Sequence, residues 1–181
     1  MANNPSGNPP VEIWENMITQ NGDSLRRLAE KQPVMLVFLR HFGCSFCREA
    51  IDDIARKRTK LEAQGIRIVM VHMAPERETA ERFFKKYKLA PVDFVSDPDC
   101  RFYRAFGLGK GTPKQLFGLM NWIRGFQAGV LEGHGFDYQG VDIGDGFQMP
   151  GVFVLHRDEV KKSFIHQFSH DRPDYEEICK L

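Results

Sequence analysis

The chain has 181 residues, 42% of them hydrophobic, and its 25 basic and 24 acidic residues leave a formal net charge of +1. This length suits one domain whose core needs no disulfide staples. The balanced charge, without a basic block, excludes an electrostatic binder of nucleic acid or of an anionic membrane. No apolar run approaches the ~18 residues of a membrane span, so a membrane partner is not expected.

The first ten residues, rich in Asn and Pro, predict a flexible N-terminal tail, with residues 11–181 forming the single domain. This segment lacks the charged and apolar regions of a signal peptide. The chain has four unevenly spaced cysteines, which do not match a secreted disulfide framework. We therefore expect a cytoplasmic protein in which a pair of nearby cysteines is catalytic or metal-binding.

The first half of the chain begins with helical apolar spacing over 11–20. Ser24 is the expected cap of a short second helix. A β-branched apolar run over 33–39 predicts a buried strand. The next helix is expected to end near Ala63, with Gly65 as its stop.

The second half continues the alternation of strands and helices. Its expected elements are a strand over 66–72 parallel to the first, a helix over 75–88, a strand over 92–95, a helix over 96–106, an apolar helix over 112–129, a Gly-rich loop over 130–147, a hairpin of 152–155 with 160–165, and a last helix from 173. This order predicts an α/β protein with a central mixed sheet flanked by helices.

Two cysteines, Cys44 and Cys47, stand where the first long strand ends and a helix begins. Unpaired N–H groups and the helix dipole favour an anion at a helix N-terminus. The pKa of the Cys44 thiol is therefore expected to be depressed, which makes it nucleophilic at neutral pH. Cys47 lies one turn further on the same side and can close a disulfide with Cys44. The strand–Cys-x-x-Cys–helix order predicts a redox-active dithiol.

Other interpretations of these residues stay open. His41 with the two cysteines offers three metal ligands, although structural zinc requires a fourth. The two thiols can also be purely structural, whereas c-type haem is excluded because Arg48 follows the motif. His41 is either a proton shuttle or a packing residue, and Arg40 either favours the Cys44 thiolate or is solvated. His166 and His170 are interpreted as a surface pair.

Several stretches resemble the alkyl hydroperoxide reductase/thiol-specific antioxidant (AhpC/TSA) family of the thioredoxin-like superfamily, that is, peroxiredoxin-like proteins. They are Val37-Phe38-Leu39-Arg40, Val95-Ser96-Asp97-Pro98, Tyr103-Arg104-Ala105-Phe106-Gly107, Phe147-Gln148-Met149-Pro150-Gly151 and Asp171-Arg172-Pro173-Asp174-Tyr175. The pattern covers residues 23–178 and is similar to the branch related to selenoprotein U and L type proteins. The resemblance implies a thioredoxin fold with a helical and loop insertion at about 110–148. It also implies a cis Met149–Pro150 bond that faces the cysteines and leaves the Met149 backbone free for a disulfide substrate.

The active-site stretch departs from the peroxiredoxin pattern Pro-x-x-x-Thr-x-x-Cys. Val37 stands at the Pro position and His41 at the Thr position, and the second arginine of the family has no match beside Met149 and Pro150. Arg40 is the candidate substitute for that arginine. These departures predict disulfide reduction with weaker turnover of peroxide.

The expected function is that of a thiol–disulfide redox enzyme with no cofactor and no metal. Cys44 is the nucleophile, Cys47 the resolving thiol, and Arg40, His41, Met149 and Pro150 support them. Its partners are a disulfide or peroxide substrate and a cellular thiol reductant of the thioredoxin or glutathione type. The alternatives are a true peroxidase and a non-enzymatic redox-sensing or metal-binding module, and a homodimer is left open.

Overall fold

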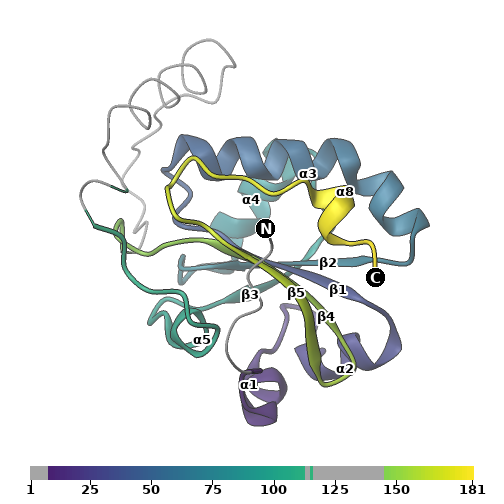
Figure 1. The fold of residues 1–181 in the computed structure, drawn as a ribbon. Helices are drawn as coiled ribbons and strands as arrows, with labels where there is room; N and C mark the ends of the chain where they lie inside the picture. Colours follow the sequence, from purple (N-terminus) through teal and green to yellow (C-terminus); the bar gives the residue numbers. More distant parts are fainter. Residues whose placement is uncertain (1–7, 113–114, 116–144) are drawn as a thin grey trace.

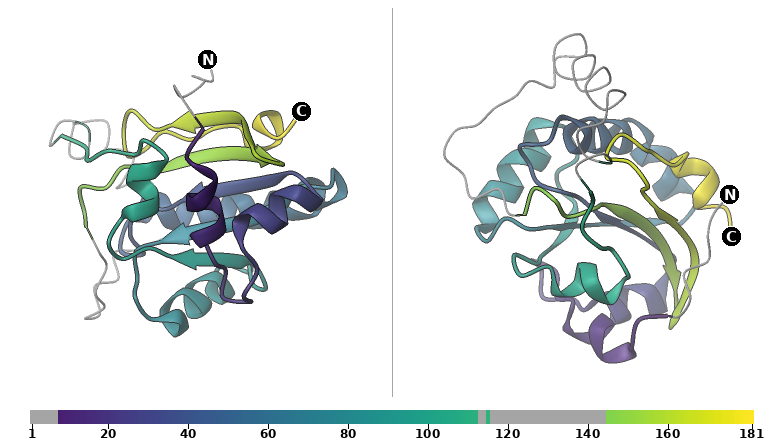
Figure 2. Two further views of the ribbon diagram at one scale, coloured as in Figure 1. Left: turned by 90° about the horizontal axis from the view of Figure 1, so that it is seen from below. Right: turned by 60° about the vertical axis from the view of Figure 1, so that its left-hand side comes forward.

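A five-stranded mixed sheet forms the centre of the computed structural model, which describes residues 8–112, 115 and 145–181 (Figure 1). The strand order is β3-β2-β1-β4-β5, and β1, β2 and β3 are parallel while β4 runs antiparallel to β1 and β5. Figure 2 shows the β4–β5 hairpin at one edge and β3 at the other. The strands are β1 (Val34–Phe38), β2 (Arg67–His72), β3 (Asp93–Ser96), β4 (Gly151–His156) and β5 (Glu159–Ile165).

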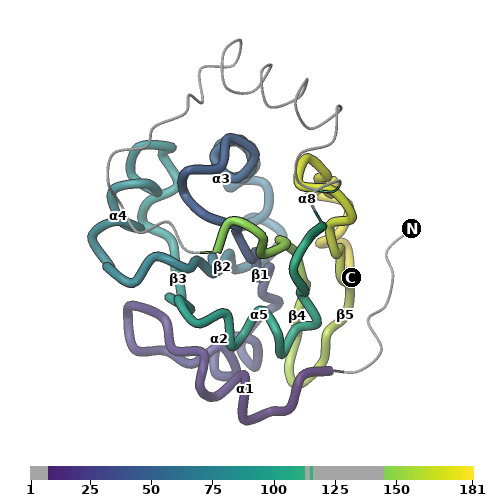
Figure 3. Tube along the Cα trace, turned by 90° about the vertical axis from the view of Figure 1, so that its left-hand side faces the viewer, coloured from purple at the N-terminus to yellow at the C-terminus, as the bar shows by residue number. Residues whose placement is uncertain are grey.

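Helices cover both faces of the sheet, which confirms the expected architecture (Figures 1 and 3). One face carries α3 (Ser45–Ala63), α4 (Arg77–Lys86) and α8 (Tyr175–Ile178). The other face carries α1 (Val11–Asn16), α2 (Leu25–Lys31) and α5 (Arg101–Ala105).

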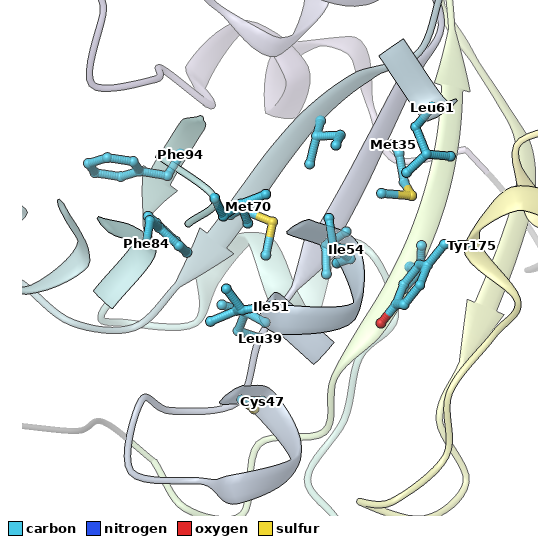
Figure 4. Packing of buried hydrophobic residues seen from close by; sticks show 14 of the residues in the cluster. Met35, Leu39, Cys47, Ile51, Ile54, Leu61, Met70, Phe84, Phe94 and Tyr175 are labelled. Atoms are coloured by element: carbon cyan, nitrogen blue, oxygen red, sulfur yellow. The ribbon is translucent and has the colours of Figure 1, made fainter. Parts of the chain in front are cut away.

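Strand β1 supplies both cores because successive side chains of a strand point to opposite faces. Met35 and Val37 pack under α3, and Leu36 and Phe38 face the opposite helices. All four are at most 2% exposed. Each such side chain contributes about 1.5–3 kcal/mol when it leaves water. Figure 4 shows the first core with Cys47 at one end, near Leu39 and Ile51, so the dithiol is built onto the rigid centre of the fold.

The ends of the helices follow their capping residues. The Ser24 hydroxyl accepts a hydrogen bond from the Arg27 N–H at the start of α2, and Gly65 with φ +77° follows the end of α3, both as expected. Helix α1 is shorter than the expected 11–20. Gln20 instead pairs with edge strand β3: its N–H donates to the Phe94 carbonyl, and its side-chain oxygen accepts from the Phe94 N–H at 2.7 Å.

Two expected segments fall largely outside the described residues. Residues 1–7 of the N-terminal tail are among these, whereas Pro9 is buried and Asn8 accepts a hydrogen bond from the Val160 N–H. The helix and loop expected over 112–147 are described only at residues 112, 115 and 145–147. Within the described part of the chain, no helix is long and apolar enough to cross a membrane.

Candidate active site

Cys44 is the N-cap of α3, and the loop before it connects β1 to this helix. The Cys44 N–H donates to the His41 carbonyl at 3.0 Å, and the Cys44 carbonyl accepts from the N–H groups of Cys47 and Arg48. The Arg48 side chain, only 1% exposed, donates from Nε to the Phe42 carbonyl at 2.8 Å. These bonds hold the loop so that both cysteines face one site at the end of β1.

The two thiols are free and differ in chemistry, although both are buried. Cys44 is 8% exposed and Cys47 4%. A hydrogen bond donated by the Cys47 thiol lowers the pKa of Cys44 well below its usual range, burial opposes this, and the Arg40 charge adds to the lowering. The same hydrogen bond, with burial, raises the pKa of Cys47 well above its usual range. Cys44 is therefore the more acidic of the two thiols, as expected; the hydrogen bond from the partner thiol contributes most to this, and the Cys47 N–H at the start of the helix contributes as well.

Arg40 connects the thiolate to the segment that leads into β4. Its Nη1 lies 3.4 Å from Cys44 Sγ, its Nε donates to the Gln148 carbonyl at 3.3 Å, and its Nη2 donates to the Gly146 carbonyl at 2.5 Å. The side chain is 6% exposed, which overturns the interpretation of a solvated arginine. A guanidinium with three acceptors is held rigidly, so its charge stays beside the sulfur.

His41 packs against this site with 9% exposure. Its Nδ1 has no hydrogen-bond partner among the described residues. Burial lowers the pKa of His41, while the neighbouring Cys44 thiolate opposes that shift. The imidazole is therefore neutral at neutral pH, and its buried Nδ1 lies beside the dithiol loop without a hydrogen bond from the described residues.

The expected cis bond at Met149–Pro150 is wrong. Among the described residues the cis peptide bond is Ala90–Pro91, and Met149–Pro150 is trans. The Met149 N–H donates to the Gly109 carbonyl at 3.1 Å, and Gln148 bridges to Lys110, so the chain runs extended and paired into β4. The Gln148 side chain also donates to the Met149 carbonyl. The backbone that was expected to bind a disulfide substrate is thus already occupied.

The metal-binding alternative concerns His41, Cys44 and Cys47. In residues 8–112, 115 and 145–181, no three His, Cys, Asp or Glu side chains come together as a metal site. His41, Cys44 and Cys47 lie close in the chain but do not form such a group. Their neighbour Arg40 supplies a positive charge, which a cation site would avoid.

Comparison with known proteins identifies the fold's relatives. The family model described as AhpC/TSA antioxidant enzyme matches residues 53–169, more than half of the chain. The chain belongs to the AhpC/TSA antioxidant enzyme family. The match begins after Cys47, so it establishes the family while the roles of the two cysteines depend on the geometry above.

Three proteins show how far the sequence similarity of this chain extends. Prostamide/prostaglandin F synthase of Salmo salar is 28% identical over 160 residues, covering 86% of this chain and 77% of that protein. Peroxiredoxin-like 2A of Mus musculus is 29% identical over 145 residues, covering 74% and 62%. The thioredoxin-like protein AAED1, chloroplastic, of Arabidopsis thaliana is 25% identical over 165 residues, covering 84% and 63%.

Solved structures confirm the thioredoxin fold. The bacterioferritin comigratory protein of Xanthomonas campestris superposes with a TM-score of 0.62 at 16% identity, covering 90% of this chain and 87% of that one. Peroxiredoxin 6 of Arenicola marina gives a TM-score of 0.62 at 8% identity, covering 92% and 70%. At these identities the likeness concerns the fold alone.

Sequence reasoning missed several residues of this AhpC/TSA site. Arg48 served only to exclude haem, yet it is buried and holds the Phe42 carbonyl. Arg172 forms an ion pair with Glu49 over the first turns of α3. His166 is half-buried rather than exposed: burial lowers its pKa to about 4, and its Nδ1 has no partner among the described residues. Tyr103 lay within a stretch that carried the family resemblance, and that was the only signal for it.

Proposed function

We propose that this chain reduces peroxides with its dithiol: Cys44 is the attacking thiolate and Cys47 the resolving thiol. The observation that supports this most directly is the environment of the Cys44 sulfur. It accepts a hydrogen bond from the Cys47 thiol and lies beside the Arg40 guanidinium. A thiolate is the nucleophilic form of cysteine, and an adjacent cation stabilises it.

The chemistry runs in two balanced steps. The Cys44 thiolate attacks one peroxide oxygen; an S–O bond forms, the O–O bond breaks, and the other oxygen leaves as hydroxide or alkoxide and takes a proton. Cys47 then attacks the sulfur of the Cys44 sulfenic acid; an S–S bond forms and its thiol proton leaves with the hydroxide as water. One thioredoxin-type dithiol or two glutathione-type thiols then reduce the Cys44–Cys47 disulfide to the dithiol and are themselves oxidised to a disulfide.

The supporting residues take roles in the first step. Arg40 holds the thiolate and faces the developing charge on the leaving oxygen, where a preorganised donor acts most strongly. We assign to His41, whose buried Nδ1 lacks a partner among the described residues, the transfer of a proton to the leaving oxygen. Met149 and Pro150 directly follow Gln148, whose carbonyl accepts from Arg40, so we assign them to the segment that holds Arg40 rather than to a substrate-binding backbone.

This proposal reverses the ranking expected from the sequence, in which disulfide reduction came first. A disulfide substrate of the thioredoxin kind needs a free backbone N–H beside the cysteines, and the Met149 N–H is bonded to Gly109. A peroxide needs only a small space and a charge-stabilising donor. Alkyl peroxide reduction is the activity ascribed to the bacterioferritin comigratory protein of Xanthomonas campestris, which is consistent with this class of substrate.

Thiol–disulfide exchange remains the second candidate, and the separation of the two thiols' pKa values supports it. An acidic, attacking Cys44 and a basic, resolving Cys47 suit both reactions. Either reaction requires a thiol reductant, so a reducing compartment such as the cytoplasm is part of the proposal. A homodimer stays a prediction from the sequence.

Stopped-flow oxidation of the reduced protein separates the two candidates. We expect hydrogen peroxide and cumene hydroperoxide to oxidise it faster than a linear peptide disulfide of equal concentration. Cys47→Ser should leave the first step intact and accumulate a Cys44 sulfenic acid, detected with dimedone, whereas Cys44→Ser should remove both. Faster oxidation by the disulfide would make exchange the function, and equal trapping by both variants would refute the division of roles.

A further inference from the structure

Tyr103 reaches the active site from the opposite face of the sheet. It lies on α5, in the core formed with α1 and α2, and is fully buried. Its hydroxyl is 2.5 Å from the Leu39 carbonyl and 3.2 Å from the Val71 carbonyl. Because a phenol has one proton, the shorter contact is the hydrogen bond it donates. The two cysteines belong to the other core, so this bond crosses the end of the sheet.

The peptide group that accepts this bond also contacts the dithiol. The Leu39 carbonyl and the Arg40 N–H belong to one peptide unit, and that N–H donates to Cys47 Sγ at 3.2 Å. Donation to a carbonyl polarises the N–H of the same amide and strengthens its own hydrogen bond. The chain of contacts is therefore Tyr103 hydroxyl, Leu39–Arg40 peptide, Cys47 sulfur and Cys44 sulfur.

We propose that Tyr103 is a positioning residue that sets the reactivity of Cys47 through the Leu39–Arg40 peptide. The N–H···S bond stabilises negative charge on Cys47, which must develop when this thiol attacks oxidised Cys44. The bond also directs the Cys47 sulfur toward Cys44. The inference rests on the proposed function, in which Cys47 resolves the intermediate on Cys44.

Charged and polar groups around Cys47 shift its pKa in opposite directions, and the Arg40 N–H bond is one of them. The Cys44 thiolate raises the pKa of Cys47, and the Arg40 guanidinium and Arg40 N–H lower it. Tyr103 faces Cys47, Cys100 and Asp97, and burial keeps the phenol neutral because it raises the pKa of Tyr103 well above its usual range. The phenol thus stays a donor at every pH at which the enzyme works.

Removal of the hydroxyl should slow the resolving step and leave the attacking step almost unchanged. With an aromatic disulfide such as 5,5′-dithiobis(2-nitrobenzoate), the first release of coloured thiolate reports attack by Cys44, and the second reports displacement by Cys47. In Tyr103→Phe we expect a second phase that is roughly 3–10-fold slower, the factor typical of one net hydrogen bond. Its pH profile should also move to higher pH.

Tyr175→Phe is the matched control. Tyr175 is a second buried tyrosine in contact with the dithiol core, and its hydroxyl makes no hydrogen bond to the Leu39–Arg40 peptide in the described part of the chain. It loses the same atom, so a general loosening of the core would slow both variants alike. Equal slowing in the two variants, or equal slowing of both phases in Tyr103→Phe, would overturn the inference.

A second measurement keeps this test independent of the proposed function. In a Cys44→Ser background, alkylation of Cys47 is followed against pH by mass mapping, with and without Tyr103→Phe. The phenylalanine should move the midpoint of Cys47 labelling to higher pH, and an unchanged midpoint would refute the role of Tyr103. If the wild type releases only one equivalent of coloured thiolate, the proposal that Cys47 is the resolving thiol is refuted. The labelling experiment then still tests the role of Tyr103.

Discussion

Arg40→Gln tests whether the guanidinium holds the Cys44 thiolate. The substitution removes the positive charge 3.4 Å from Cys44 Sγ and retains a shorter side chain with an amide donor. It also releases the carbonyls of Gly146 and Gln148. We expect the pKa of Cys44 to rise in this variant, because the thiolate loses the positive charge that stabilises it in the wild-type protein.

The expected size follows from the contact distance and the burial. Unit charges 3.4 Å apart attract with about 5 kcal/mol at an effective dielectric constant of about 20, before the desolvation of both groups is subtracted. Net values for hydrogen bonds to charged groups are about 1.5–3 kcal/mol. Since about 1.4 kcal/mol is a factor of ten, we expect the thiolate-to-thiol ratio at a fixed pH to fall by roughly 10- to 100-fold.

The assay is the pH dependence of thiolate absorbance at about 240 nm, checked by the rate of Cys44 alkylation with mass mapping. Arg58→Gln is the control, since it removes the same charge from the far end of α3, where Arg58 pairs with Glu62 and the Leu89 carbonyl. Arg40→Lys should restore part of the effect, because lysine keeps the charge but not the three-way fork. A titration midpoint of Arg40→Gln equal to that of Arg58→Gln would refute the reasoning.

Two further predictions concern stability. Burial among aromatic rings lowers the pKa of His72 from 6.5 to about 4. As the pH falls, the imidazole is therefore protonated in the unfolded chain before it is protonated in the folded protein. The free energy of unfolding should decrease between about pH 6.5 and about pH 4. Chemical denaturation of His72→Leu should therefore show an acid-induced loss that is smaller by up to about 3 kcal/mol, and an unchanged pH slope would contradict this. A Cβ on Gly151 would lie 2.7 Å from Leu108 Cδ2 in the core, so Gly151→Ala should cost about 1–3 kcal/mol by urea unfolding. Gly109→Ala, with no described atom within 4 Å of the new Cβ, should change stability by less than about 1 kcal/mol, and equal costs at the two sites would exclude overpacking as the cause.

Local patterns predicted most of the fold and the place of the dithiol. Strand β1 and helix α3 follow from apolar periodicity and from Gly65, which are properties of neighbouring residues. The same holds for Cys44 at the strand–helix junction. The resemblance to AhpC/TSA proteins added the thioredoxin fold, whereas the strand order β3-β2-β1-β4-β5 came only with the structure.

Contacts between distant residues were not predictable in this way. The extended path at Gln148 and Met149 pairs with residues 108–110, some forty positions earlier. Burial of Arg48 depends on the Phe42 carbonyl in the turn and on the ring of Phe83, which lies 5.8 Å from the guanidinium carbon. These partners come from a tight turn and from a distant helix, which apolar periodicity does not report, so the polar supports of the site were missed while its thiols were found.

The opposite pKa shifts of the two thiols give the proposed reaction its direction. If Cys47 were the thiolate, the attacking sulfur would be the more deeply buried one, at 4% exposure, and it would lack the contact with the Arg40 guanidinium. The shared hydrogen bond instead places the negative charge on Cys44 and keeps a proton on Cys47. Once Cys44 is oxidised its charge is gone, and the largest influence that raised the pKa of Cys47 disappears with it. Oxidation of the first thiol therefore prepares the second for attack, and the Arg40 N–H is already in place to stabilise it.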